Sequence, residues 1–513
     1  MRRIGIDVGG TNTDAVLLAD GAVVHAVKTP TTDDVTGGIV AALSALSTHP
    51  IAAAGAIDAV VIGTTHFVNA VIVRQGLARV AAIRLGLPAA ASLPPFCDWP
   101  ADLAEQVRGE VLMLEGGHDY DGREIVPFDE AGMRRAAQQI RERGIHSVAV
   151  AAIFSPVDAS GEERARTILA QEYPEAAVTL SHDLGRIGLL ERENAALLNA
   201  ALIALARKTV AGFIAAIAAS GIDAPLFLTQ NDGTVMEAGA ATSLPVMTFA
   251  SGPTNSMRGA AFLSGLTDSI VVDVGGTSTD IGQLRRGFPR EANSVVEIGG
   301  VRTLFRMPDL LSIGLGGGSL VRRDPLTLGP QSVGYRLTSE ALVFGGDTLT
   351  ATDAAVAAGI AEIGDRRHVA DLPRDLIRAT LATAHDRIED AVDRIKTEAA
   401  DVPLIAVGGG AFLIPDKLAG VSRVIRVPYG AHANAVGAAI AQIGGETDQI
   451  YRDLDRASAI AMAEELARGR AVSAGALRDT IQTVDVEDIP LAYLPGNALR
   501  VRVRVAGEMR GAG

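Results

Sequence analysis

The chain has 513 residues, of which 48% are hydrophobic and 21% are charged. This length exceeds what one hydrophobic core usually serves, so we expect at least two lobes. The net charge of −14 argues against nucleic acid or an anionic membrane as a partner, and the single cysteine excludes a disulfide framework or a cysteine-based zinc site within one chain.

The chain contains an internal repeat: residues 4–18 read IGIDVGGTNTDAVLL, and residues 270–284 read IVVDVGGTSTDIGQL. Each copy has an apolar run, then Asp-Gly-Gly-Thr-x-Thr-Asp, then a second apolar run, which is typical of a β-hairpin with a Gly-rich turn. The opening aspartates, Asp7 and Asp273, are 266 residues apart, about half of the chain. A repeat at this spacing predicts a duplicated lobe.

Strands and helices alternate between the two hairpins. The segments AVVHAVK (22–28), SVAVAAI (147–153) and AAVTLS (176–181) predict strands, and the Pro-rich region 91–127 predicts an inserted subdomain. A long helix is expected from about residue 191 to residue 220. Because Arg207 and Lys208 interrupt its apolar stretch, we interpret it as a core helix and not as a membrane span. Since the N-terminus shows no charged-then-apolar signal, we expect a cytoplasmic location.

The second half of the chain predicts helices near residues 351–363 and 373–400, a strand at 404–407 and a helix after His432. This alternation indicates an α/β protein, and the repeated hairpins predict two duplicated lobes with a cleft between them. We expect an N-terminal lobe over residues 1–180, a second lobe over 181–447, and a C-terminal helix and strand extension over 448–513. Within that extension, LRVRVRV (499–505) predicts a strand with one basic face, which is either solvated or docked against a partner chain.

The Gly-Gly-Thr turns have the chemistry of a phosphate site. Paired glycines allow positive φ angles, successive amides can point into one concavity, and hydroxyl groups add donors. The residues expected to bind phosphate are Gly9, Gly10, Thr11 and Thr13 in the first turn and Gly275, Gly276, Thr277 and Ser278 in the second. Phosphate repels a carboxylate unless a hard cation lies between them. We therefore expect Asp7 and Asp273 to hold Mg²⁺, directly or through water, and to take part in catalysis.

Two further glycine runs extend this predicted site. Gly408, Gly409 and Gly410 follow a buried strand, where the absence of side chains lets a base or ribose lie against the backbone, so we expect them to bind adenosine. Gly316 and Gly317 are expected to contact the nucleotide as well, with simple close packing as the alternative.

Polar residues near strand ends are candidates for the substrate side of the site. Asp232 follows the strand PLFLTQ together with Asn231, and we expect Asp232 to be catalytic, although a simple turn explains both residues equally. His66 is a second catalytic candidate, for which a packed histidine is the alternative. Thr64 ends the strand before it, where an anion or the substrate can bind at the start of a helix.

Two Gly-rich phosphate hairpins and a later Gly-Gly-Gly turn resemble the superfamily of actin, sugar kinases and the Hsp70 ATPase. Within it, the sequence resembles the hydantoinase/oxoprolinase family, at the ATP-binding subunit called N-methylhydantoinase A. Besides the two hairpins, the strings that carry this resemblance are GTTHFVNAVIVRQG (63–76), GGHDYDGRE (116–124), LTQNDGTV (228–235), ASGPTNS (250–256) and IGLGGGS (313–319). They cover about residues 4–440. The stretch YRLTSEALVFGG (335–346) departs from longer family members, which leaves the substrate and partner docking open.

The resemblance implies a function and partners. It implies ATP-dependent hydrolysis of a cyclic amide such as a hydantoin, oxoproline or a lactam, with this chain as the subunit that phosphorylates the amide oxygen using ATP and Mg²⁺. It also implies a second hydantoinase-type subunit in an oligomer. The alternatives are an ATP-using ketone carboxylase subunit, a sugar-type kinase and a non-catalytic ATPase or reactivase.

Overall fold

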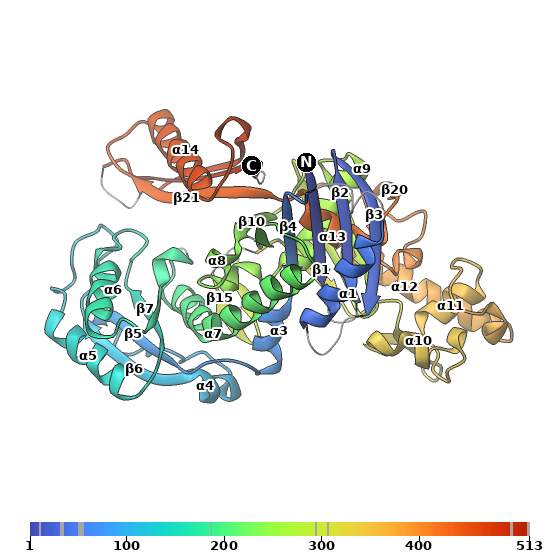
Figure 1. Cartoon of the computed structure of the whole chain (residues 1–513), viewed down its shortest axis with the longest axis horizontal. Helices are drawn as coiled ribbons and strands as arrows, with labels where there is room; N and C mark the ends of the chain where they lie inside the picture. The colour runs from blue at the N-terminus through green and yellow to red at the C-terminus, as the bar shows by residue number, and fades with distance from the viewer. Residues whose placement is uncertain are drawn as a thin grey trace.

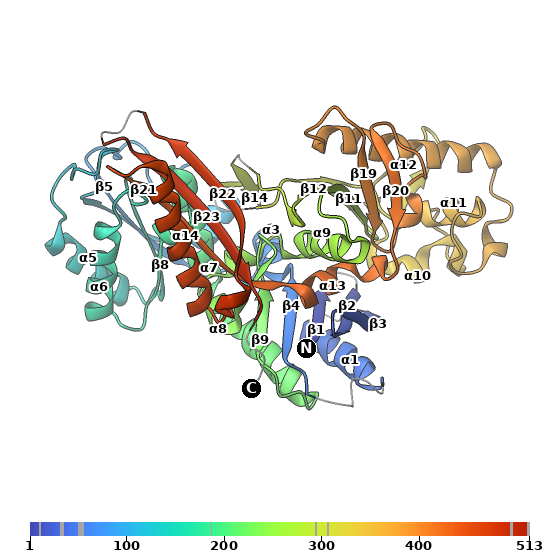
Figure 2. The ribbon, with the colours of Figure 1, turned by 90° about the horizontal axis from the view of Figure 1, so that it is seen from above.

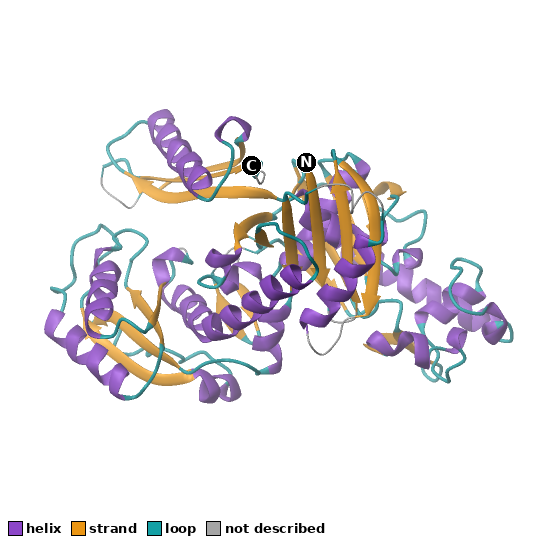
Figure 3. Ribbon diagram, in the orientation of Figure 1, coloured by secondary structure: helices purple, strands orange, loops and turns teal. Residues whose placement is uncertain are grey.

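Two sheets, each containing one of the repeated hairpins, form the centre of the molecule (Figure 1). The computed structural model describes residues 1–9, 12–30, 35–49, 56–185, 187–292, 295–304, 307–492 and 496–509. Helices pack against the faces of the sheets (Figure 3). The α-helices of the described residues are α1 (Val35–Ser47), α3 (His66–Val73), α4 (Ala101–Val107), α5 (Glu130–Glu142), α6 (Ser160–Glu172), α7 (Leu189–Ala219), α8 (Ala238–Ala241), α9 (Ser251–Ser264), α10 (Leu337–Glu340), α11 (Ala351–Ala357), α12 (Arg374–Ile395), α13 (Ala433–Ile440) and α14 (Arg456–Ser473).

The first sheet combines strands from both ends of the chain. Its described strands lie in the order β22, β23, β21, β10, β9, β4, β1, β2 and β3. Their bounds are β1 (Arg2–Val8), β2 (Asn12–Ala19), β3 (Ala22–Pro30), β4 (Ala59–Thr64), β9 (Leu226–Thr229), β10 (Thr234–Glu237), β21 (Gln442–Tyr451), β22 (Gln482–Pro490) and β23 (Leu499–Gly507). In β1, Ile4, Ile6 and Val8 pack against α1 and α7. Since side chains alternate along a strand, Gly5 and Asp7 face the opposite side of the sheet.

The second sheet repeats this arrangement. Its described strands lie in the order β13, β12, β11, β19 and β20, with β16 paired to β12. Their bounds are β11 (Ser269–Val274), β12 (Thr279–Arg285), β13 (Phe288–Pro289), β16 (Leu310–Ile313), β19 (Val402–Val407) and β20 (Val421–Arg426). Ile270, Val272 and Val274 of β11 pack against α11 and α12, whereas Val271 packs against α9. The same alternation places Asp273 on the α9 side.

Helices α9 and α13 lie between the two sheets (Figure 2). Glycines bring their backbones together: a Cβ atom on Gly437 of α13 would lie 1.8 Å from the Asn255 carbonyl oxygen of α9, and one on Gly259 would lie 2.0 Å from the Ala433 oxygen. A Cβ on Gly5 of β1 would lie 2.1 Å from the Ala435 oxygen. The two central helices are therefore locked to each other and to the first sheet, and both repeated aspartates face the layer that these helices form.

A third, four-stranded sheet forms a separate layer in the described part of the chain, at one end of the molecule (Figure 1). Its order is β6, β5, β7 and β8, with bounds β5 (Val80–Leu87), β6 (Arg108–Glu115), β7 (Ser147–Ala152) and β8 (Ala177–Leu180). It spans more of the chain than the inserted subdomain expected at 91–127. Shorter described pairs are β14 (Val296–Ile298) with β15 (Val301–Thr303) and β17 (Ser319–Arg322) with β18 (Thr327–Ser332).

The sheets divide the chain differently from the expected domains. Strands β9 and β10 follow the predicted boundary at residue 180, yet they pair with the first sheet through β4. Long helix α7 carries the chain back to that sheet, and its apolar residues belong to the core that β1 also forms. The first sheet is thus assembled from separate segments of sequence, and the third sheet is inserted between β4 and β9.

The C-terminal extension also joins the first sheet, through β21. The basic residues of β23 are not solvated. Arg502 and Arg504 are only 4% and 5% exposed, and both bind the carboxylate of Glu291 from the second half of the chain over 2.6 Å. Arg452 of the extension donates to the Asp121 oxygen beside the third sheet over 3.0 Å. The extension therefore contacts both the third sheet and the segment that follows β13.

Helix α7 is long and apolar enough to cross a membrane by length and composition alone. Half of its most apolar window is buried inside the protein, and its buried side chains contact strands of the first sheet. This packing supports the interpretation of α7 as a core helix.

Candidate active site

The two repeated hairpins have the same register. Asp7 pairs with Asp14 across β1 and β2, and Asp273 pairs with Asp280 across β11 and β12. Directly opposed residues of an antiparallel pair point to the same face, so each hairpin presents two carboxylates side by side. In both turns the amide of the first glycine donates to a backbone oxygen three positions on, over 3.1 Å from Gly9 and 2.9 Å from Gly275. Gly10 and Thr11 lie outside the described residues.

Three of these four carboxylates, those of Asp14, Asp280 and Asp7, have hydrogen-bond partners of different kinds. Asp14 binds Lys28 Nζ at 2.6 Å and His432 Nδ1 at 2.9 Å. Asp280 accepts a hydrogen bond from Ser312 Oγ. Asp7 accepts one from the neutral amide of Asn434 at 3.2 Å. The charge of Asp14 is therefore compensated by Lys28, whereas Asp7 is held by a neutral group.

Burial and like charge act on Asp7 and Asp273. Burial, with the neighbouring Asp14 and Asp273, raises the pKa of Asp7 to about 7. Burial, with the neighbouring Asp280, raises the pKa of Asp273 to about 6. The charge of Asp273 adds to the rise in the pKa of Asp7, so these two carboxylates, one from each hairpin, are near enough to repel each other. A cation between these carboxylates relieves that repulsion.

The donor set fits Mg²⁺ bound together with phosphate. Among the described residues, no group of three His, Cys, Asp or Glu side chains is placed to hold a metal ion by itself. Mg²⁺ usually takes one or two carboxylates and completes its shell with water and phosphate oxygens. Asp7 and Asp273 are the carboxylates that match this use, because Asp14 already binds Lys28.

The second turn is open on the side where phosphate is expected. Gly276 and Thr277 are exposed and Ser278 is half-buried, and a Cβ on Gly276 would meet no atom within 4 Å. Thr13 differs from the expectation, because its side chain has no exposed surface. Its counterpart Thr279 is equally buried and donates to the Leu315 oxygen over 2.6 Å. A phosphate contact by Thr13 stays a prediction that needs a local rearrangement.

The run Gly316–Gly318 packs against the turn of the second hairpin and forms hydrogen bonds with its backbone. The amides of Gly317 and Gly318 donate to the oxygens of Gly275 and Gly276 over 3.0 and 2.7 Å, and the amide of Gly316 donates to Ser319 Oγ over 2.8 Å. A Cβ on Gly316 would lie 2.6 Å from the Gly276 carbonyl carbon. Close packing, the alternative considered for Gly316 and Gly317, thus explains these glycines, and their contact with nucleotide stays a prediction.

The glycine turn after β19 lies directly beside Asp273. Gly408 has φ +89°, and a Cβ there would lie 2.2 Å from Asp273 Oδ1. The amide of Gly410 donates to the Val274 oxygen over 2.7 Å, whereas Gly409 has no atom within 4 Å of a Cβ position. A cavity of about 520 Å³ opens here, lined by Ile360, Gly408, Phe412, Asp416 and Arg426 among others. Its size suits a small-molecule group such as adenosine, and of the three predicted glycines only Gly408 lines it.

The polar residues at the end of β4 lie next to Asp7. Thr64 exchanges hydrogen bonds with Ser251 Oγ at 3.3 and 3.1 Å, which joins β4 to the start of α9. A Cβ on Gly252 would lie 3.9 Å from Asp7 Oδ1. His66 begins α3, and burial lowers the pKa of its imidazole. A neutral imidazole at this place can accept a proton, so His66 keeps its candidate role.

Asn231 and Asp232 have local structural roles. Asn231 is buried, and its side chain accepts from the Ala250 amide at 2.8 Å and donates to the Val246 oxygen at 3.0 Å. Asp232 accepts from the amide and hydroxyl of Thr234 at 2.9 and 2.7 Å. These contacts match the simple-turn alternative, and a catalytic role for Asp232 stays a prediction.

Sequence reasoning missed Lys28, His432 and Asn434. Lys28 was placed only within a predicted strand, although the pairing of Asp14 with Lys28 in neighbouring strands follows from the β2–β3 register. His432 and Asn434 belong to a segment more than 400 positions away from the hairpin they contact. No sequence signal besides the predicted helix start pointed to them.

Comparison with known proteins gives matches over most of the chain. The family model of the hydantoinase/oxoprolinase N-terminal region matches residues 3–173, and the hydantoinase/oxoprolinase model matches residues 192–362. Caprolactamase subunit alpha of Pseudomonas jessenii is 26% identical over 482 residues, which cover 83% of this chain and 68% of that protein. Acetophenone carboxylase gamma subunit of Aromatoleum aromaticum is 28% identical over 393 residues, which cover 69% of this chain and 53% of that protein. The chain thus spans about half to two thirds of the length of these relatives.

Two solved structures share the fold over 99% of this chain. The ATP-dependent caprolactamase from Pseudomonas jessenii has a TM-score of 0.79 at 21% identity, and the match covers 88% of that chain. A nucleotide-free acetone carboxylase has a TM-score of 0.69 at 18% identity, also over 88% of that chain. These similarities confirm the predicted α/β fold of duplicated, actin-like ATPase lobes.

Proposed function

Because the chain belongs to the hydantoinase/oxoprolinase family, we propose that it is the ATP-binding subunit of an enzyme that hydrolyses a cyclic amide with consumption of ATP. One observation carries this proposal. Asp7 is buried and Asp273 is half-buried, each begins one of two matching Gly-rich turns, and the charge of Asp273 acts on Asp7. A cavity of about 520 Å³ opens at Gly408, beside Asp273.

In this proposal, different residues bind the adenosine and the phosphates of the nucleotide. Adenosine occupies the cavity at Gly408, and the phosphates lie between the turns that follow Asp7 and Asp273. Mg²⁺, when bound, neutralises charge between these two carboxylates and the phosphate oxygens. Lys28 lies on Asp14 and lowers the pKa of both Asp7 and Asp273 by its charge, so it is close enough to both hairpins to stabilise a phosphate between them.

The chemistry explains why a lactam needs ATP. An unstrained amide carbonyl is a poor electrophile, so the γ-phosphoryl group passes to the carbonyl oxygen, the amide nitrogen loses its proton and ADP leaves. Water adds to the activated carbon, and the C–N bond breaks to release the amine and an acyl phosphate. A second water converts the acyl phosphate to carboxylate and inorganic phosphate. The protein positions the two substrates and stabilises charge on the transferred group.

A second subunit completes the enzyme in this proposal. Two curated relatives are named as the alpha subunit of a caprolactamase and the gamma subunit of a carboxylase. The sequence similarity to a subunit of acetophenone carboxylase favours one second candidate, ATP-dependent carboxylation of a ketone. In that reaction the ketone enolate and bicarbonate would be the activated groups.

Product analysis separates the two reactions. The chain, co-expressed with a hydantoinase-type second subunit, is incubated with MgATP and either ε-caprolactam, 5-oxoproline or hydantoin, or a ketone with bicarbonate. ADP release that depends on an amide and yields the ring-opened acid supports the proposal. A heavy-oxygen label on the amide carbonyl that appears in inorganic phosphate supports phosphorylation of that oxygen. ADP release that requires a ketone and bicarbonate contradicts the proposal and supports the second candidate.

A further inference from the structure

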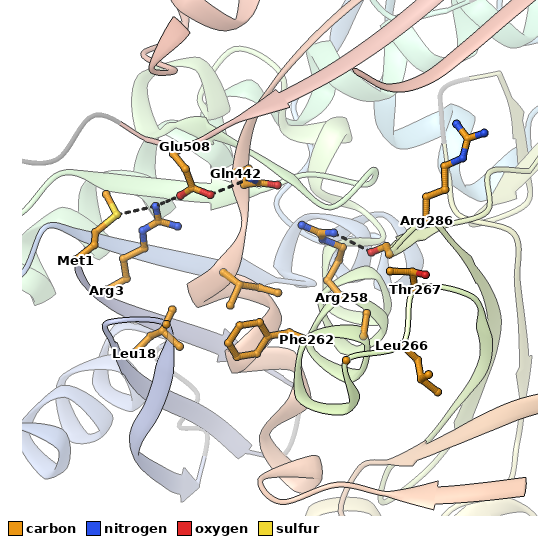
Figure 4. Close-up of a pocket in the computed structure, with 15 residues that line it drawn as sticks. Met1, Arg3, Leu18, Arg258, Phe262, Leu266, Thr267, Arg286, Gln442 and Glu508 are labelled. Atoms are coloured by element: carbon orange, nitrogen blue, oxygen red, sulfur yellow. Dashed lines mark hydrogen bonds and ion pairs between the residues drawn. The ribbon is translucent and has the colours of Figure 1, made fainter. Parts of the chain in front are cut away.

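A cavity of about 580 Å³ lies at the C-terminal ends of α9 and α13, away from the nucleotide site at their N-terminal ends. Its walls come from these helix ends, the first hairpin, the turn after β12 and the end of β23 (Figure 4). None of the residues assigned above to nucleotide or Mg²⁺ lines it. Small-molecule pockets commonly have volumes of about 300–1,000 Å³, so this cavity is large enough for a ligand.

Arg258 is the unusual polar residue of this cavity. It lies on α9 with only 9% of its surface exposed, donates from Nη1 to the Gly287 oxygen over 2.8 Å and stacks 3.8 Å from the centre of the Phe288 ring. Its buried Nε has no hydrogen-bond partner among the described residues. Burial and the nearby Arg504 lower its pKa to about 10, while Asp232 and Glu508 act on it only at longer range. The guanidinium is therefore a buried cation with a free donor.

The other charged side chains of the cavity are paired or point elsewhere, although the Nε atom of the buried Arg3 also has no hydrogen-bond partner among the described residues. Glu508 binds Arg3 Nη2 at 2.6 Å and Gln442 Nε2 at 2.9 Å, so this carboxylate is satisfied. Arg286 is exposed, and Figure 4 shows its side chain turned away from Arg258. A ligand with an amino group would find no free carboxylate on these walls, whereas a ligand with an acceptor oxygen would find Arg258.

The rest of the wall is apolar. Leu18, Phe262, Leu266 and Ile440 line the cavity, and the Phe262 ring remains 38% exposed. Contact with an apolar ligand would remove this surface from water. An inorganic phosphate would leave these side chains uncovered and would find too few donors for its oxygens. The walls therefore favour one acceptor group on an apolar body.

We propose that this cavity binds a small carboxylic acid with an apolar body, whose carboxylate accepts from the Arg258 guanidinium and whose body lies against Phe262 and Ile440. This site goes beyond the proposed function, since binding of the acid needs neither ATP nor a cyclic amide. Charge-assisted hydrogen bonds to a guanidinium are among the strong ones, and their strength rises where water is excluded.

The cavity lies where a bound ligand can affect the nucleotide site. Helices α9 and α13 reach from this cavity to Ser251 and Asn434 at the nucleotide site, and their backbones are in close contact at Gly259 and Gly437. A ligand that shifts either helix end therefore changes the site at Asp7. We expect the acid to alter the rate of ATP hydrolysis. This consequence rests on the proposed function, whereas the binding itself does not.

Calorimetric titration of the full chain without nucleotide tests the site. Hexanoate and phenylacetate are the probes, and hexanamide and hexylamine are the matched ligands without a carboxylate. We expect hexanoate to bind at least about tenfold more tightly than hexanamide. Arg258→Gln should weaken hexanoate binding by at least about tenfold, whereas Arg286→Gln, the same change at a side chain turned away from Arg258, should leave it within about twofold.

A second variant covers the case in which Arg258→Gln does not fold. Phe262→Glu replaces a partly exposed side chain and places a negative charge beside the carboxylate, so it should abolish hexanoate binding. Ile214→Glu, at an exposed residue of α7, is its control and should leave binding unchanged. The site is refuted if hexanoate does not bind at millimolar concentration, if hexanoate and hexanamide bind alike, or if Phe262→Glu binds as the wild type does. Hexanoate binding without any change in ATP hydrolysis refutes only the coupling, and loss of ATP hydrolysis in every sample points to a failure of the proposed function.

Discussion

Asn434 Nδ2 donates a hydrogen bond to Asp7 Oδ2 over 3.2 Å, although 427 positions of sequence separate the two residues. The bond joins the first turn of α13 to the end of β1. It holds the carboxylate in place without neutralising it, while the neighbouring Asp14 binds the Lys28 ammonium group and the imidazole of His432. The first hairpin thus presents one oriented carboxylate, that of Asp7, which can bind a cation such as Mg²⁺.

Replacement of Asn434 by alanine should lower ATP hydrolysis by about tenfold or more. Groups that orient a metal-binding carboxylate typically contribute about 10–100-fold to metal affinity or activity. The assay is the MgATP and Mg²⁺ dependence of the rate, where we expect the Mg²⁺ requirement to rise. Asn69→Ala serves as the control, because it removes an exposed amide of α3 that, among the described residues, donates to Thr65 just before that helix. Equal rates of ATP hydrolysis in wild type and Asn434→Ala would contradict the role of Asn434 in orienting Asp7.

Replacement of Lys28 by alanine should reduce ATP hydrolysis by at least about tenfold, because the charge between the hairpins is lost where the phosphates lie. The Lys28 side chain is 37% exposed, so the effect on the free energy of unfolding should stay within about 1 kcal/mol. Lys208→Ala, at an exposed lysine of α7, is the control. Steady-state rates and urea unfolding together distinguish lost activity from lost stability. A large stability loss with normal activity in the remaining folded protein would contradict the assignment.

Replacement of Glu291 by glutamine should destabilise the fold by about 3–5 kcal/mol, because it takes the carboxylate from the buried Arg504 and one carboxylate from the buried Arg502, which keeps Glu446. Glu465→Gln breaks the exposed pair with Arg478 and should cost about 1 kcal/mol or less. Urea unfolding measures both. If the two variants lose similar stability, the contact between β23 and the segment that follows β13 contributes little to the free energy of unfolding.

The pair Glu162 and His182 predicts a pH dependence of stability. Burial tends to raise the pKa of Glu162, but hydrogen bonds from His182 and Ser181 outweigh it and leave that pKa below its usual 4.5. Burial tends to lower the pKa of His182, but the bond to Glu162 outweighs it and leaves that pKa above 6.5. The His182 contribution is therefore complete below pH 6.5 and is lost as the pH rises through the folded pKa. The Glu162 contribution is complete above pH 4.5 and is lost as the pH falls through its folded pKa.

His182→Gln should therefore flatten the pH profile of the unfolding free energy. Between about pH 5.5 and about pH 8.5, the wild type should lose more stability than the variant. His368→Gln changes an exposed histidine and should keep the wild-type profile. Parallel profiles for wild type and His182→Gln would contradict the pKa directions.

The hairpins could be predicted because their signal is local. Strand, glycine turn and strand follow each other within 15 residues, and the repeat fixes which aspartates correspond. The glycine turn at residues 408–410 could be predicted for the same reason, because these glycines directly follow a buried strand in the sequence.

The environment of the aspartates could not be predicted, because it depends on tertiary contacts. Asn434 and His432 reach the first hairpin only because α13 packs against β1 through Gly5. Strands β9 and β10 join the first sheet only because α7 returns the chain to it. The basic face of LRVRVRV is buried because Glu291, more than 200 positions away, supplies the opposite charge.

Thermal unfolding with and without MgATP tests the central claim, that Asp7 and Asp273 together form the nucleotide site. Ligand at about a hundred times its dissociation constant should stabilise the wild type by about 2.7 kcal/mol. The variant with Asp7→Asn and Asp273→Asn should fold and lose this shift, because its hairpins no longer present the charges that Mg²⁺ needs. A shift of the same size in wild type and double variant would contradict the account, and so would a wild type that no concentration of MgATP stabilises, alone or with its second subunit.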